Sequence, residues 1–81
     1  MNVFTVTYTD VYDRLSYISR NMANSPEGSD DYARYGIEYD DILFDYISYR
    51  DYTELVKRSS NVTDWIAFDA NIIYGKINNR R

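Results

Sequence analysis

The chain has 81 residues, a formal net charge of −4, 44% hydrophobic residues, and neither cysteine nor histidine. This length and composition fit one folded, soluble domain over residues 1–81 with a single modest core. The missing cysteines exclude disulfides and thiolate chemistry, and the missing histidines remove the side chain best suited to proton transfer near neutral pH. We therefore expect a protein that is not an enzyme and that carries no catalytic residue and no cofactor.

The cellular location of the protein is predicted from further features that the sequence lacks. No apolar run approaches the roughly 18 residues that a membrane-spanning helix needs. The first ten residues, MNVFTVTYTD, show neither the positive region nor the apolar region of a secretory signal. We expect a cytoplasmic protein that does not bind a membrane. No Asp-x-Asp-x-Asp-Gly loop is present, so no metal site is expected.

The N-terminal third predicts a short strand followed by a helix. Residues 2–8 are rich in β-forming side chains, and Phe4, Val6 and Tyr8 alternate with Val3, Thr5 and Thr7, as in a strand or an extended arm. Thr9 or Asp10 fits a helix N-cap, with Asp13 in the first turn. Residues 24–30, NSPEGSD, form the loop that ends this helix. The apolar stripe of the helix has the spacing i, i+4, i+7, i+11, and consists of Val11, Leu15, Ile18 and Met22.

The middle of the chain predicts a second helix, capped by Ser29 or Asp30. Gly36 weakens it and allows a kink or a break. A bend at Arg50 and a cap at Asp51 introduce a short third helix that ends before the loop at 59–61. The 3-4-3-4-3 spacing typical of a helix seam is followed by Tyr32, Tyr35, Tyr39, Ile42, Tyr46 and Tyr49.

The last segment allows two structures. As a helix it begins at the cap Asn61 and ends just before Gly75. As a β-hairpin it turns at residues 69–71. We favour the helix, which makes the fold mainly α with a short N-terminal strand; the hairpin would make it α+β. Residues 78–81 are expected to fray.

Acidic residues are concentrated in residues 27–54, which hold nine Asp or Glu and two arginines, a net charge of −7. On a helical projection Glu38, Asp41 and Asp45 form one stripe that tyrosines border. Carboxylates on such a stripe recur about every 5–6 Å along the axis, a spacing of the same order as the phosphates of one DNA strand. An acidic helix face that only keeps a small protein soluble is the alternative. The candidate protein-binding residues are Asp31, Glu38, Asp40, Asp41, Asp45, Tyr32, Tyr35, Tyr46 and Tyr49.

Small size, absent cysteine, a pI near 4.5 and acids crowded with tyrosines in residues 27–54 resemble a type of protein, not a single family. The type comprises the short inhibitors that bacteriophages and mobile elements make against host defences, including anti-restriction and anti-CRISPR proteins. Several of these act as DNA mimics. The resemblance implies a stoichiometric inhibitor whose acidic helix occupies the basic channel of a nucleic-acid-binding protein in the host cytoplasm, and which does not itself bind nucleic acid.

Two other classes stay open. A protein-binding regulator of the antitoxin, anti-sigma or immunity type would use the tyrosines, and its affinity would change little with salt. A self-associating helical protein would use the tyrosine seam between Tyr32 and Tyr49 to form a homodimer.

Overall fold

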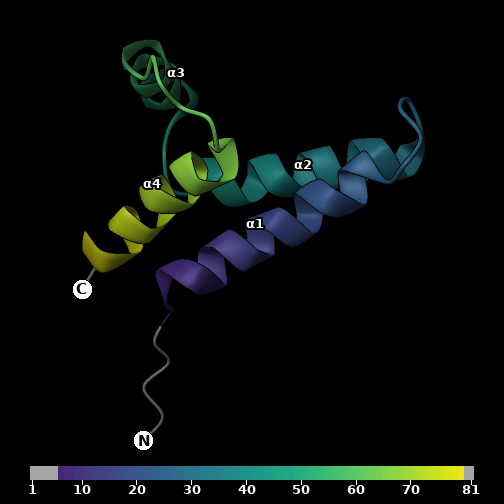
Figure 1. Cartoon of the computed structure of the whole chain (residues 1–81), viewed down its shortest axis with the longest axis horizontal. Helices are drawn as coiled ribbons and strands as arrows, with labels where there is room; N and C mark the ends of the chain where they lie inside the picture. The colour runs from purple at the N-terminus through teal and green to yellow at the C-terminus, as the bar shows by residue number, and fades with distance from the viewer. Residues whose placement is uncertain (1–5, 80–81) are drawn as a thin grey trace, which may run out of the picture.

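The computed structural model describes residues 6–79, which contain four helices (Figure 1): α1 (Tyr8–Ala23), α2 (Asp30–Phe44), α3 (Tyr49–Arg58) and α4 (Trp65–Asn79). No strand occurs in this part of the chain, so the mainly α prediction is confirmed and the C-terminal hairpin is wrong. The predicted N-terminal strand falls mostly on residues 2–5, outside the described residues. Tyr8, its last predicted residue, already belongs to α1.

Helix α1 begins earlier than the sequence predicted, because Thr7 rather than Thr9 or Asp10 caps it. The Thr7 hydroxyl accepts a hydrogen bond from the Asp10 backbone N–H (3.1 Å), and the Asp10 carboxylate accepts one from the Thr7 N–H (2.9 Å). This reciprocal capping box satisfies two N–H groups that a helix start would otherwise leave unpaired. Asp10 is therefore the acid of the first turn, the place that was assigned to Asp13.

Helices α1 and α2 form an antiparallel hairpin through the predicted loop, and Ser29 caps α2 as expected. The apolar stripe of α1 is correct, since Val11, Leu15 and Ile18 are all buried. Helix α2 runs unbroken through Gly36, so the break that this glycine allowed does not occur. A Cβ at Gly36 would lie 3.6 Å from the Met22 Cε, so Met22 of α1 packs closely against the bare backbone there.

Helix α4 packs against α1 and completes the core with Ala70 and Ile73. It begins at Trp65, not after Asn61, because Asp64 caps it: the Asp64 Oδ1 accepts a hydrogen bond from the Ala67 N–H (3.1 Å). The helix continues past Gly75 to Asn79, so the predicted end at Gly75 is wrong. Residues 78 and 79, expected to fray, lie in the last turn, and 80–81 are outside the described residues.

Helix α3 stands apart from the α1–α2 pair in Figure 1 and contributes no buried residue. Ser48, not Asp51, caps it, since its hydroxyl accepts a hydrogen bond from the Asp51 N–H (3.1 Å). Because α2 ends at Phe44 and buried Ile47 lies in the turn that follows, the predicted seam from Tyr32 to Tyr49 is divided between two helices. The prediction of one continuous tyrosine seam is therefore wrong.

Candidate functional site

The three acids predicted to share a stripe do lie together. Glu38, Asp41 and Asp45 line one shallow hollow on the side of α2, with a volume of about 510 Å³. Between the acids the hollow is apolar, and Ile37 is 62% exposed there. We call this site the acidic hollow, and its complete lining is Arg14, Arg34, Ile37, Glu38, Asp41, Ile42, Asp45 and Tyr46.

Two arginines reduce the negative charge of the acidic hollow. The Arg14 guanidinium of α1 lies 2.6 Å from the Glu38 carboxylate, and the Arg34 guanidinium lies 2.9 Å from that of Asp31, one turn away on α2. Arg14 was not expected here, because only the pairing of α1 with α2 brings it to Glu38. Both ion pairs are exposed to water, where such pairs contribute about 0–1 kcal/mol. The three carboxylates of the hollow still outnumber its two guanidinium groups.

The predicted tyrosines do not form a continuous border. Tyr46 lines the acidic hollow. Tyr32 and Tyr35 lie on the N-terminal half of α2, where both are half-buried and the Arg34 guanidinium is 5.6 Å from the Tyr35 ring centre. Tyr49 belongs to α3, is 73% exposed, and packs beside Phe44 rather than among the acids.

Asp40 is separated from the other acids of α2. It lines a second hollow, together with Tyr39 of α2, Ser19 of α1 and Trp65 of α4. The helical projection also puts Asp40 outside the stripe of Glu38, Asp41 and Asp45, because residues 40 and 41 leave the helix about 100° apart. An assisting role of Asp40 in binding a partner stays a prediction.

A buried carboxylate that sequence reasoning did not assign joins three helices. Asp69 of α4 is 3% exposed. Its Oδ2 accepts a hydrogen bond of 2.5 Å from the Tyr39 hydroxyl of α2, and its Oδ1 accepts one of 2.8 Å from the Tyr52 hydroxyl of α3. We call these three residues the Asp69 junction. The sequence held one indication of this role, namely an aspartate at an apolar position of the last helix, since a buried carboxylate needs a hydrogen-bonding partner.

The protonation states of the Asp69 junction follow from its burial. Burial raises the pKa of Asp69, although the hydrogen bonds from the two phenols oppose this shift. Burial, followed by the hydrogen bond to Asp69, also raises the pKa values of the Tyr39 and Tyr52 phenols. Both phenols therefore stay protonated at neutral pH and remain donors. The junction is suited to holding helices together.

A second tyrosine–aspartate pair anchors the start of α4 to α1. The Tyr12 hydroxyl donates a hydrogen bond of 2.9 Å to the Asp64 carboxylate. The bond from the Ala67 N–H, followed by that from Tyr12, lowers the pKa of Asp64. This carboxylate therefore stays charged while it caps α4.

Comparisons with known proteins do not supply a function. A scan of protein-family models and searches of curated proteins and of solved structures found no match to this chain. Within residues 6–79 no cluster of three acidic side chains could hold a metal ion. Every helix in the same range is too short or too polar to cross a lipid bilayer. The acidic hollow is the candidate site on its geometry alone.

Proposed function

We propose that this protein is a non-enzymatic, stoichiometric inhibitor of a nucleic-acid-handling host-defence protein, a CRISPR effector or a restriction system. The observation that supports this is the gathering of Glu38, Asp41 and Asp45 on one side of α2. A helix that is packed against α1 holds its carboxylates in place before binding, so little conformational entropy is lost. The face of α2 that carries the acidic hollow would enter a basic channel of the partner and occupy the place of nucleic acid.

The chemistry of the acidic hollow suits a lysine or arginine side chain of the partner. The charged head group would meet Asp41 and Asp45, while the aliphatic stem would lie on Ile37 and Ile42. Arg14 already holds Glu38, but both side chains are exposed, so the partner can replace or share that ion pair at small cost. Charge attraction would make association fast and sensitive to salt.

The exposure of Ile37 supports a second candidate function. A row of phosphates presents no apolar group that Ile37 could imitate. An isoleucine that is 62% exposed in the same hollow as a tyrosine is instead typical of an ordinary protein–protein contact. A regulator of the antitoxin, anti-sigma or immunity type would bind its protein partner mainly through this apolar part. Its affinity would then change little with salt.

The test is to capture partners from bacterial lysate at low and at high salt with three forms of the protein. The first is the wild type. The second changes the acidic hollow, with Glu38→Lys, Asp41→Lys and Asp45→Lys. The control makes the same change in charge away from the hollow, with Asp13→Lys, Glu27→Lys and Asp30→Lys. Circular dichroism establishes that all three forms are folded.

The expected result is a nucleic-acid-binding partner that the wild type and the control capture at low salt and that the hollow variant loses. With the purified partner, equimolar wild-type protein should then release a bound DNA duplex. A partner retained at high salt but lost on Ile37→Asp would assign the regulator function instead. Equal capture by the hollow variant and the control would contradict the inhibitor proposal, and capture that also survives Ile37→Asp would contradict the regulator function.

A further inference from the structure

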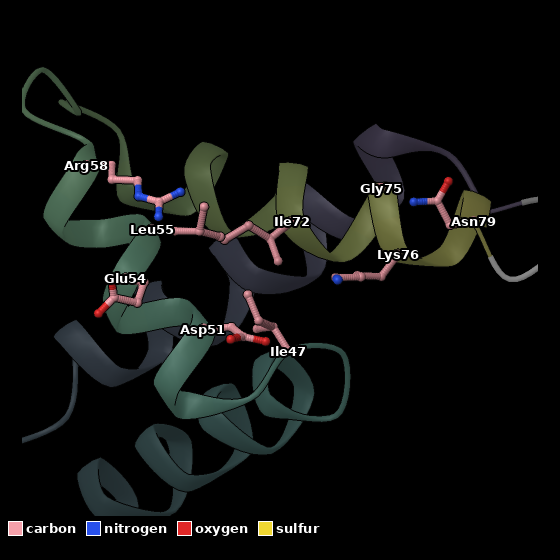
Figure 2. Close-up of a pocket in the computed structure, with 9 residues that line it drawn as sticks. All are labelled: Ile47, Asp51, Glu54, Leu55, Arg58, Ile72, Gly75, Lys76 and Asn79. Atoms are coloured by element: carbon pink, nitrogen blue, oxygen red, sulfur yellow. The ribbon is translucent and has the colours of Figure 1, made fainter.

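A groove lies between α3 and α4, lined on α3 from Asp51 to Arg58, and it shares no residue with the acidic hollow. Its volume is about 500 Å³. Figure 2 shows the side chains of Leu55 on α3 and Ile72 on α4 turned toward one another, with Ile47 deeper between the two helices and Arg58 at one end. We call it the α3–α4 groove. Leu55 is 36% exposed in it, so its apolar lining is partly open to water.

Gly75 of α4 faces the same groove and has no role inside the fold that explains it. Its φ is not in the left-handed region, and a Cβ added there would meet no atom within 4 Å. A glycine within a helix weakens that helix relative to alanine. What this glycine does provide is bare backbone, against which another surface can pack closely.

The charges along the groove balance one another. Its two acids, Asp51 and Glu54, lie on α3, and its two basic residues are Arg58 of α3 and Lys76 of α4. The protein as a whole carries a net charge of −4, so two copies repel one another in general. At this groove the local charge is close to zero, and two copies can approach there.

One face of α3 is complementary to itself. Asp51, Leu55 and Arg58 follow the spacing i, i+4, i+7 and all line the groove. If two α3 helices pack antiparallel about a two-fold axis at Leu55, Asp51 lies about 6 Å to one side of the axis and Arg58 about 4.5 Å to the other. Each Asp51 then faces the other copy's Arg58, and the two leucines meet at the axis. Two-fold dimers require this kind of self-complementarity.

We propose that the α3–α4 groove is a homodimer interface, occupied by α3 of a second copy of this chain. Leu55 of the second copy lies between Leu55 and Ile72 of the first, and the second copy's α3 approaches the bare backbone at Gly75. This dimer differs from one built on the tyrosine seam, which the structure divides between α2 and α3. It also leaves the acidic hollow of each copy open.

The experiment compares sedimentation velocity of the wild type with that of Asp51→Arg and Arg58→Asp over a wide range of concentration. The wild type should form a dimer as concentration rises. Each variant alone places like charges opposite one another, twice per dimer, and should self-associate at least about tenfold more weakly. In an equimolar mixture of the two variants, both contacts pair an arginine of one variant with an aspartate of the other, so the mixture should recover the dimer. The matched control, Arg50→Asp, changes the charge of α3 equally but lies outside the groove, and should dimerise like the wild type.

A covalent measurement tests the same interface without altering its charges. The chain has no cysteine, so Leu55→Cys introduces a single thiol at the proposed two-fold axis. A disulfide requires the two Cα atoms to come within about 7 Å, so mild oxidation should give a covalent dimer much faster for Leu55→Cys than for Lys57→Cys, its control on the same helix.

Three outcomes overturn the proposal. The first is a wild type that stays monomeric at every concentration. The second is a wild-type dimer that persists in both single charge variants, because the dimer would then use another surface. The third is equal oxidation of the two cysteine variants, because random collision would then explain the cross-link.

Discussion

The hairpin of α1 and α2 with α4 differs from α3 in how it is held in the fold. In the described residues, every buried hydrophobic side chain lies on α1, α2, α4 or the turn before α3, and α3 has none. Helix α3 is attached instead by Tyr52, which donates a hydrogen bond to Asp69 and packs edge-on against Phe44 and Phe68. Apolar burial stabilises the hairpin and α4, whereas α3 depends on one hydrogen bond and on the ring contacts of partly exposed tyrosines.

The largest effect that separates the two regions comes from shortening one leucine in each. Leu15 is fully buried, so Leu15→Ala should lower the free energy of unfolding by about 2–5 kcal/mol. Leu55 is 36% exposed, so Leu55→Ala should lower it by less than about 1 kcal/mol. Urea denaturation of both variants at a concentration where the protein is monomeric measures the difference. Equal losses would mean that α3 belongs to the core after all.

An intermediate effect is expected from the hydroxyl that attaches α3. Tyr52→Phe keeps the ring contacts but removes one hydrogen bond to a buried carboxylate, which should cost about 1.5–3 kcal/mol. Because α3 has no buried residue, its backbone amides should exchange with solvent much faster in Tyr52→Phe than in the wild type, while the exchange of the α1 amides should change little. Hydrogen exchange measures this, with Tyr49→Phe as the control on the exposed side of α3. Uniform acceleration in all four helices would contradict a local attachment.

The smallest effect concerns pH. Because the pKa of Asp69 is raised in the folded protein, the folded state binds more protons than the unfolded chain between pH 3.8, where aspartate ordinarily titrates, and the raised pKa. Stability therefore falls as pH rises through this window. The side chain of Asp69→Asn cannot titrate, so this contribution is absent from the variant. As pH rises through the window, the unfolding free energy of the wild type should therefore fall relative to that of the variant. Unfolding in urea at several pH values measures it, and a difference that moves in the opposite direction would show that hydrogen bonding outweighs burial.

The parts of the fold that could be predicted are those that local chemistry decides. The Ser29 cap, the loop predicted at residues 24–30 and the stripe through Leu15 depend on neighbouring residues. The structure confirms the cap and the stripe, and the segment between α1 and α2 covers residues 24–29, because Asp30 already belongs to α2. The end of α2 at Phe44 could not be predicted, because no glycine or proline marks it. There the burial of Ile47 and the cap at Ser48 outweigh a heptad pattern that continues to Tyr49.

The candidate site was predictable to a similar degree. Helical spacing alone placed Glu38, Asp41 and Asp45 side by side, and the structure brings them to one hollow. Their neighbour Arg14 comes from another helix, and no pattern within residues 27–54 contains it. The role of Asp69 was equally hidden, because its partners Tyr39 and Tyr52 lie 30 and 17 residues away in the chain.

The position of Asp69 also bears on how the chain folds as it is synthesised. Helices α1 and α2 are joined by a short loop and pack on one another, so they can pair once residue 44 is available. Helix α3 is made next, but the carboxylate that holds it belongs to α4 and does not yet exist. A nascent chain therefore lacks the hydrogen bond between Tyr52 and Asp69 until α4 has been made, and before that α3 contacts the hairpin through the rings beside Phe44.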